Sequence, residues 1–261
     1  MTRGKNLAIL QGDDRFNLGP SGFYLDDHLL HIDRDGHVIN EKSVIDILFE
    51  SGWESLLFSG PGRSKMVREE DPTHLNDIEA LPAEMESAFP MFNAGDLMMS
   101  FRHLNTVLVV EPKNWHVKWA MTGPWLMQHD PDFLPNGHIL VYDNRVTGAK
   151  PVLGNTRLVE VDPATKQIVR IFEGKGEEAF YASERGEQQR LPNGNLLLVD
   201  PFGGRLVEVA PDSGYHVVWE WVNLVAPGSA GMITDTQRIG EAAANDWVGR
   251  PCDGVGVAAS Q

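Results

Sequence analysis

The sequence predicts an all-β protein built from repeated four-stranded antiparallel units, which is the arrangement of the blades in a β-propeller. A Leu-Pro-Asn-Gly turn occurs at residues 134–137 and again at 191–194, and a shortened copy, Leu-Pro at 81–82, precedes them at a similar interval. Further apolar stretches follow each turn, so each unit contains four short strands. Units of this kind every ~40–55 residues are typical of propeller blades. An ordinary β-sandwich, the main alternative, leaves the repetition unexplained.

The repeat sets the boundaries that we expect within a single propeller domain over residues 1–261. The expected segments are a partial blade at 1–40, a loop or cap at 41–71, complete blades at about 72–123, 127–175 and 180–222, and a divergent tail at 223–261. The partial blade holds only the second half of the repeat, because no Leu-Pro turn precedes its apolar run at 29–32.

The turns within each unit indicate that neighbouring strands are antiparallel. Asn-Gly at 136–137 and 193–194 predicts a two-residue hairpin of the primed type, because these residues tolerate the positive φ that both central positions require. A second turn, at 33–36 in the first unit and at 162–165 in the third, joins the last two strands in the same way.

Composition and charge exclude several classes of function. The 261 residues are 42% hydrophobic and carry a formal net charge of -15. This charge is unfavourable for binding nucleic acid or an anionic membrane, since both need clustered Lys and Arg. The single cysteine, Cys252, excludes an internal disulfide and a Cys-cluster metal site. No apolar stretch approaches the ~20 residues of a membrane-spanning helix, and the run at 7–10 is too short for a signal-peptide core.

Three polar clusters, at residues 74–77, 101–105 and 128–131, lie where predicted strands begin or end. In an antiparallel unit, the start of the first strand and the end of the second lie at the same rim. His74 and His129 begin the first strands of two consecutive units, and Arg102 ends a second strand. We therefore expect these three side chains to gather at one mouth of the central channel.

Two histidines and an arginine suit the transfer of an anionic group. A neutral histidine is a competent nucleophile, a second histidine moves a proton, and an arginine binds a tetrahedral oxyanion in a fixed fork. This combination is typical of phosphoryl or sulfuryl transfer, in which positioning and charge neutralisation account for most of the reduction in the activation barrier. Because the sequence has no Gly-rich phosphate loop, a nucleotide donor is not expected.

The motifs His-x-Asn-Asp-Ile (74–78), Ser-x-Arg-His-x-Asn-Thr (100–106) and Gln-His-Asp-x-x-x-Leu-Pro-Asn-Gly (128–137) together resemble the bacterial arylsulfotransferase family. The resemblance covers about residues 29–240. It implies a six-bladed ring, of which this chain is an incomplete or divergent version. It also implies a ping-pong reaction, in which a histidine takes a sulfuryl group from an aryl sulfate ester and passes it to a phenol. The implied partners are small aryl sulfates and phenols, and the implied location is periplasmic or secreted.

Matched by motif, the resemblance gives each candidate residue a role. His129 is the sulfated nucleophile, Arg102 binds the sulfuryl oxygens, and His74 acts as a hydrogen-bond donor or as a general acid or base. The implied substrate-binding residues are Asn76, His103 and Asn105. No cofactor and no metal are expected, and a second copy of the chain is one source of the missing blades.

Two other functions fit the same repeat. A non-catalytic binding propeller would keep the blades without needing the histidines and the arginine. A metal-dependent propeller lactonase would use carboxylates around a divalent ion, and Asp143-Asn144 at the same rim either binds such a metal or caps a turn. The tryptophans on the later strands are interpreted as packing between blades: Trp115, Trp119, Trp219 and Trp221.

Overall fold

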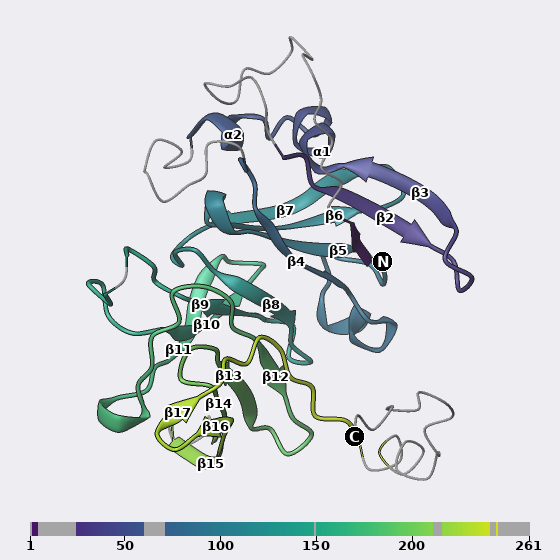
Figure 1. Cartoon of the computed structure of the whole chain (residues 1–261). Coiled ribbons are helices and arrows are strands. Elements are labelled where there is room, and N and C mark those ends of the chain that lie inside the picture. The colour runs from purple at the N-terminus through teal and green to yellow at the C-terminus, as the bar shows by residue number, and fades with distance from the viewer. Residues whose placement is uncertain are drawn as a thin grey trace, which may run out of the picture.

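The structure of the chain, a computed structural model, describes residues 2–4, 25–59, 71–148, 150–210, 216–240 and 244. Its architecture confirms the predicted all-β class, because three four-stranded antiparallel sheets follow a three-stranded sheet along the chain. In Figure 1 the N-terminal sheet and the last four-stranded sheet lie at opposite ends of the molecule. None of the helices in these ranges is long and apolar enough to cross a membrane.

Each four-stranded sheet forms one blade, and the N-terminal sheet precedes the first blade. The N-terminal sheet contains β1 (Thr2–Gly4), β2 (His28–Ile32) and β3 (Val38–Ser43), followed by α1 (Val44–Glu50) and α2 (Ser55–Ser59). The first blade contains β4 (Leu75–Ala80), β5 (Leu97–Phe101), β6 (Thr106–Glu111) and β7 (His116–Thr122). The second contains β8 (His129–Phe133), β9 (Ile139–Asp143), β10 (Arg157–Asp162) and β11 (Gln167–Phe172). The third contains β12 (Gln188–Arg190), β13 (Leu196–Asp200), β14 (Arg205–Ala210) and β15 (His216–Val222).

Three short 3-10 helices and one small hairpin complete the described elements. They are η1 (Ala83–Ala88), η2 (Arg102–Leu104), η3 (Gly176–Glu178), β16 (Leu224–Ala226) and β17 (Ser229–Ala230).

The blades repeat one another down to a bulge in the outer pair of strands. In every blade the strands pair in chain order, and the register of the last two strands shifts by one residue at the same step. The pair just before the shift is Val109 with Trp119 in the first blade and Glu208 with Trp219 in the third. These two tryptophans therefore hold equivalent positions.

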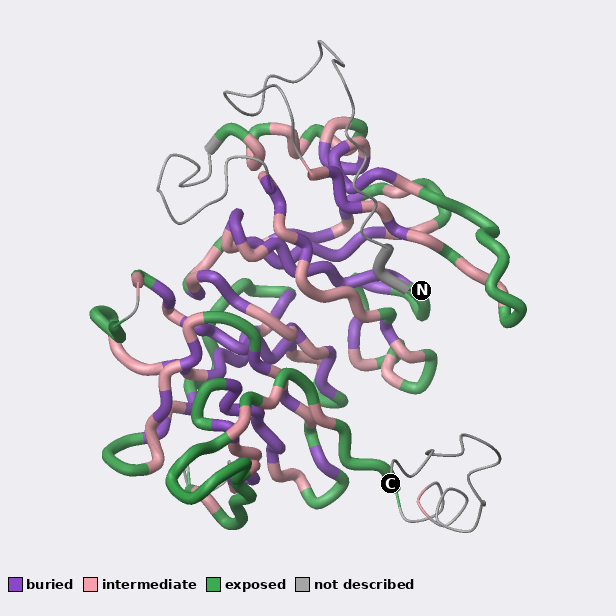
Figure 2. Tube along the Cα trace, viewed as in Figure 1, coloured by how far each residue is buried: buried purple, intermediate pink, exposed green. Residues whose placement is uncertain are grey.

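The apolar cores lie between consecutive sheets, and the second strand of each blade is buried along its whole length, because a sheet covered on both faces buries both sets of side chains. Trp119 is only 3% exposed, and its indole N–H donates to the carbonyl oxygen of Pro163 on the next blade (2.9 Å). Tyr142 is fully buried, and its hydroxyl donates to the Val199 carbonyl of the third blade (2.8 Å). In Figure 2 the buried residues follow the strands between neighbouring sheets, whereas the outer turns are exposed.

The segment predicted as a loop or cap at 41–71 contains helices where it is described. The Ser43 hydroxyl accepts the backbone N–H of Asp46 (3.0 Å), which caps the N-terminus of α1. Val44, Ile47 and Leu48 then follow the helical spacing and are buried against the first blade. A loop was the wrong prediction for residues 44–50, because an amphipathic helix of seven residues does not stand out in an apolar stretch. Residues 60–62 lie outside the described part.

The Asn-Gly turns differ from the predicted two-residue hairpin. Gly137 has φ 84° and Gly194 has φ 87°, but the preceding asparagines keep negative φ. Leu134 N–H donates to the His138 carbonyl (2.8 Å) and Gly137 N–H to the Leu134 carbonyl (3.0 Å). This pattern is a three-residue turn that ends in a glycine bulge, and the proline before each asparagine favours it by fixing φ near −65°.

The last blade departs from the predicted tryptophan packing. Trp219 and Trp221 are each 47% exposed, whereas the equivalent Trp119 is buried. The difference arises because the second blade covers Trp119, while no further four-stranded sheet follows the third blade within the described ranges.

The two glycine bulges provide a matched test of the blade interface. A Cβ at Gly137 would collide with the Ala88 carbonyl oxygen, whereas at Gly194 it meets nothing closer than the Arg190 guanidinium at 4.0 Å. Both substitutions to alanine incur the left-handed strain of about 1–2 kcal/mol. We expect Gly137→Ala to lower the free energy of unfolding further than Gly194→Ala, as measured by urea denaturation. Equal losses would show that the carbonyl at 88 does not constrain this turn.

Candidate functional site

A cavity of about 410 Å³ opens at the rim where the inner strands begin. Its walls come from the start of β4, the start of β8, the turn before β12, and the chain that follows β17. The lining residues are His74, Asn76, Asp77, His129, Asp130, Arg185, Gly186, Glu187, Thr234 and Asp235. The blade register thus brings His74 and His129 to one cavity.

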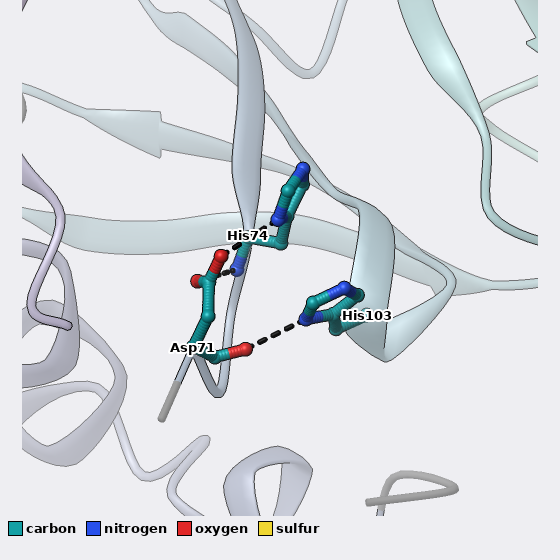
Figure 3. A group of neighbouring side chains, drawn as sticks. All are labelled: Asp71, His74 and His103. Atoms are coloured by element: carbon teal, nitrogen blue, oxygen red, sulfur yellow. Dashed lines mark hydrogen bonds and ion pairs between the residues drawn. The ribbon is translucent and has the colours of Figure 1, made fainter. Parts of the chain in front are cut away.

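His74 and His103 are both held by one residue, Asp71 (Figure 3). The Asp71 carboxylate bonds Nδ1 of His74 (2.7 Å) and accepts its backbone N–H (3.0 Å), while the Asp71 carbonyl accepts from Nδ1 of His103 (2.6 Å). Burial opposes ionisation of Asp71, but the hydrogen bond and charge of His74 outweigh it and hold the pKa of Asp71 below its ordinary value. Nε2 of His74 is therefore the ring nitrogen that Asp71 leaves available.

His129 is fixed as a neutral imidazole. The amide nitrogen of Asn144 donates to the carbonyls of Ala182 (3.0 Å) and Arg185 (2.7 Å), so its oxygen is turned toward Nδ1 of His129 (2.8 Å) and accepts the proton there. Burial, together with the positive charge of Arg102, lowers the pKa of His129 to about 3 despite the Asn144 bond. Nε2 keeps its lone pair and accepts the backbone N–H of Arg185 (3.1 Å).

The turn that carries this N–H is tightly placed. Arg185 has φ 64° and Gly186 has φ 113°, and a Cβ on Gly186 would overlap the ring of Tyr142. Only glycine therefore lets the turn approach β9 closely enough for the Arg185 amide to reach His129.

Arg102 lies behind the two histidines and does not line the cavity. Its backbone N–H donates to the His74 carbonyl (3.1 Å), and its guanidinium donates weakly to the Ser183 carbonyl (3.5 Å). Burial lowers the pKa of Arg102, against the attraction of Glu184 and Asp71. A guanidinium keeps its charge in proteins, and its Nε has no hydrogen-bond partner among the described residues.

The three residues that the resemblance assigns to substrate binding occupy different environments. Asn76 lines the cavity and donates to the Gln128 carbonyl (2.7 Å), while its buried Oδ1 has no partner in the described ranges. His103 is 4% exposed and stacks against His74, with ring centroids 4.5 Å apart. Asn105 is outside the lining: its side chain accepts the Met127 N–H (2.8 Å) and orders the loop before β8.

Carboxylates that the sequence reasoning missed surround the floor of the cavity. Asp77, Asp130 and Glu187 each stand four residues before the leucine of a Leu-Pro turn, so they occupy the same place on three inner strands. Their common repeat position was the signal that could have revealed them. Asp235 adds a fourth carboxylate from the tail.

The tail segment 233–238 takes the place of an inner strand for a fourth blade. Thr236 N–H donates to the Glu187 carboxylate (3.1 Å), just as Gln188 N–H donates to the Asp130 carboxylate. One step further, Arg238 N–H donates to the Gln189 side chain (2.7 Å), just as Phe133 N–H donates to Glu79 (2.9 Å). By this register Asp235 is the equivalent of Glu187 and Asp130.

Burial and crowding raise the pKa of three carboxyl groups at or beside the cavity. Burial, the hydrogen bond with Asp235 and the charge of Asp77 raise the pKa of Glu187 to about 8. Burial and the charges of neighbouring carboxylates also raise the pKa of Asp130 and Asp132 well above their ordinary values. Some of these carboxyl groups are therefore protonated at neutral pH, which reduces the negative charge beside the histidines.

The Asp143-Asn144 pair has structural partners. Asp143 accepts the backbone N–H groups of Leu126 (2.8 Å) and Arg145 (3.1 Å) and an ion pair from Arg157 (2.8 Å). Together with the contacts of Asn144, this favours the turn and positioning interpretation over the metal one. Among the described residues, Asp71, His74 and His103 are near enough for a metal, but both Nδ1 atoms already bond Asp71.

Comparison with known proteins identifies the family. The sequence profile described as "Arylsulfotransferase (ASST)" matches residues 10–223. The chain belongs to the arylsulfotransferase family. The predicted family is therefore confirmed. No curated protein matches the sequence.

Solved structures with a similar chain path are much longer. Virginiamycin B lyase from Staphylococcus aureus has 12% identity and a TM-score of 0.43, over 79% of this chain and 50% of that one. The Dos1 propeller has 9% identity and a TM-score of 0.45, over 75% and 42%. The WD40 β-propeller domain of Doa1 has 14% identity and a TM-score of 0.39, over 56% and 40%. The chain thus spans half or less of each of these structures.

The protonation of His129 can be tested through Asn144. We expect the His129 ring signals, followed by NMR against pH, to stay those of a neutral Nδ1–H tautomer down to about pH 4, because its pKa is about 3. Asn144→Asp places a carboxylate on Nδ1 and should shift that pKa upward. Asn93→Asp, in an exposed loop, adds the same charge elsewhere and should leave it unchanged. Titration of wild-type His129 near pH 6.5 would contradict the assignment.

Proposed function

We propose that this chain carries the sulfuryl-transfer site of an arylsulfotransferase, with His129 as the nucleophile. The observation that supports this most is the state of His129, which is neutral, holds its proton on Nδ1 and directs Nε2 to the wall of a cavity shared with His74. A lone pair fixed in this way is what a covalent intermediate on histidine requires.

The first half-reaction forms a bond between Nε2 of His129 and the sulfur of an aryl sulfate, as the sulfur–oxygen bond to the aryl group breaks. The leaving phenolate takes a proton from Nε2 of His74, whose other ring nitrogen is held by Asp71. In the second half, a phenol returns that proton to His74 while its oxygen takes the sulfuryl group from His129. The first half leaves His129 sulfated and His74 without that proton, and the second half restores both residues.

In this proposal two further groups stabilise the transferred anion. Arg102 supplies a half-buried positive charge that acts on His129 and needs no reorganisation during the reaction. The backbone N–H of Arg185 donates to Nε2 at rest. It must release that atom for attack and is then within reach of an oxygen on the bound group.

Intact-protein mass spectrometry tests the covalent step. Incubation with an aryl sulfate should add the mass of one sulfuryl group, in an acid-labile form, and His129→Ala should abolish the adduct. His116→Ala removes an exposed histidine and should keep it. A folded wild-type protein that never acquires the adduct would overturn the mechanism and favour a non-catalytic binding propeller. Loss of activity in a chelator would favour the lactonase.

The raised pKa of Glu187 predicts a loss of activity at alkaline pH. Ionisation through its pKa of about 8 adds negative charge beside the site. The KM for an anionic aryl sulfate should therefore rise between about pH 7 and 9, and Glu187→Gln should flatten this rise.

The stability of the folded protein should depend on the ionisation of the same carboxyl group. Because the pKa of folded Glu187 lies above its unfolded value, the native state binds more protons between about pH 4.5 and 8, and stability falls as pH rises through that window. Glu187→Gln should raise Tm relative to the wild type more at pH 9 than at pH 6. An equal Tm difference at both pH values would contradict the raised pKa.

A further inference from the structure

The interface between the first two blades shows what a blade binds on the face that it turns toward the next blade in the chain. Trp119 on β7 donates its indole N–H to the Pro163 carbonyl in the β10–β11 turn. Lys166 of the same turn donates to the Ala120 carbonyl (2.8 Å) and lies 5.9 Å from the Trp119 ring centroid. A blade thus binds the turn between the third and fourth strands of the blade that follows.

The third blade has the same face without its cover. Trp219 is the equivalent of Trp119, and Trp221 is the equivalent of Phe172, which is 4% exposed against the third blade. Both tryptophans are 47% exposed. A cavity of about 370 Å³ lies on this face, between Leu206, Trp219 and the inner-strand segment at Arg238. The face therefore has the form of a blade interface.

The N-terminal sheet has the complementary features. Its β2–β3 turn begins with Asp33, whose carboxylate accepts the Asp35 N–H (2.9 Å), as Asp162 accepts the Ala164 N–H (2.8 Å) in the β10–β11 turn. Val38 and Ile39, just after the turn, are 54% and 60% exposed. The sheet also has three strands and, within the described ranges, no inner strand beside β1, whereas segment 233–238 lies where the inner strand of a fourth blade would lie.

One chain cannot join these two surfaces, because the N-terminal sheet and the last blade lie at opposite ends of the molecule and the other face of that sheet packs on the first blade (Figure 1). We propose that the last blade of one copy binds the N-terminal sheet of a second copy, with segment 233–238 as its inner strand. Two such head-to-tail contacts close a ring of two chains. The ring would brace the segment that brings Thr234 and Asp235 to the active-site cavity.

Sedimentation velocity on the full chain tests the assembly without measuring activity. We expect a particle of twice the 29.0 kDa chain mass. Trp219→Lys on the last blade should reduce it to a monomer, and so should the double change Val38→Lys with Ile39→Lys on the N-terminal sheet. Val152→Lys, which alters another exposed apolar residue outside both surfaces, should leave the dimer intact. Thermal melts would verify that each variant is folded.

Mixing the two disrupted variants distinguishes head-to-tail pairing from other dimers. The Trp219 variant keeps an intact N-terminal sheet and the Val38 and Ile39 variant keeps an intact last blade, so an equimolar mixture should form a two-chain complex through the one remaining interface. A mixture that stays monomeric would overturn the proposal. A wild-type chain that is monomeric at all concentrations, or that forms assemblies larger than two chains, would overturn it as well.

Discussion

Hydrogen bonds between consecutive inner strands are the constraint on which the site depends. Acidic side chains of one blade accept backbone N–H groups from the next: Glu79 accepts from Phe133, Asp130 from Gln188 and Glu187 from Thr236. Because the donors are backbone groups, these bonds fix how far apart the inner strands lie. They therefore hold the β4 start, the β8 start and the turn before β12 around one cavity.

The same constraint determines the electrostatics of the cavity. Gathering carboxylates at equivalent positions crowds negative charge into a buried space, and the protein responds by holding some of them protonated, as the raised pKa of Glu187 shows. The ionisation states differ around the two histidines. There Asp71 stays ionised through its bonds with His74, and burial keeps His129 neutral beside the charged Arg102. A protein with net charge -15 can in this way present a local site for an anion.

Sequence patterns predicted the parts of this protein that repeat. The Leu-Pro turns gave the strand order and the rim at which His74 and His129 meet, because antiparallel pairing leaves only one place for these strand ends. The same patterns could not predict α1, because the apolar residues of a seven-residue helix resemble any apolar run. They also could not predict the bulged form of the Asn-Gly turns, which the proline before each asparagine favours. Asn105 matched the motif, yet its side chain serves the loop before β8.

The sequence by itself determined the all-β class, the blade repeat and the family, and it indicated that His74 and His129 lie at one rim. These features depend on local periodicity and on residue type at fixed spacing. Only the tertiary structure decided which nitrogen of His129 carries its proton, because that depends on Asn144 and on carbonyls from the turn at 182–185. It also decided that four carboxylates share one cavity and that Trp219 is exposed while Trp119 is buried. Burial, hydrogen-bond direction and charge crowding arise between strands that are distant in the chain, so no local pattern encodes them.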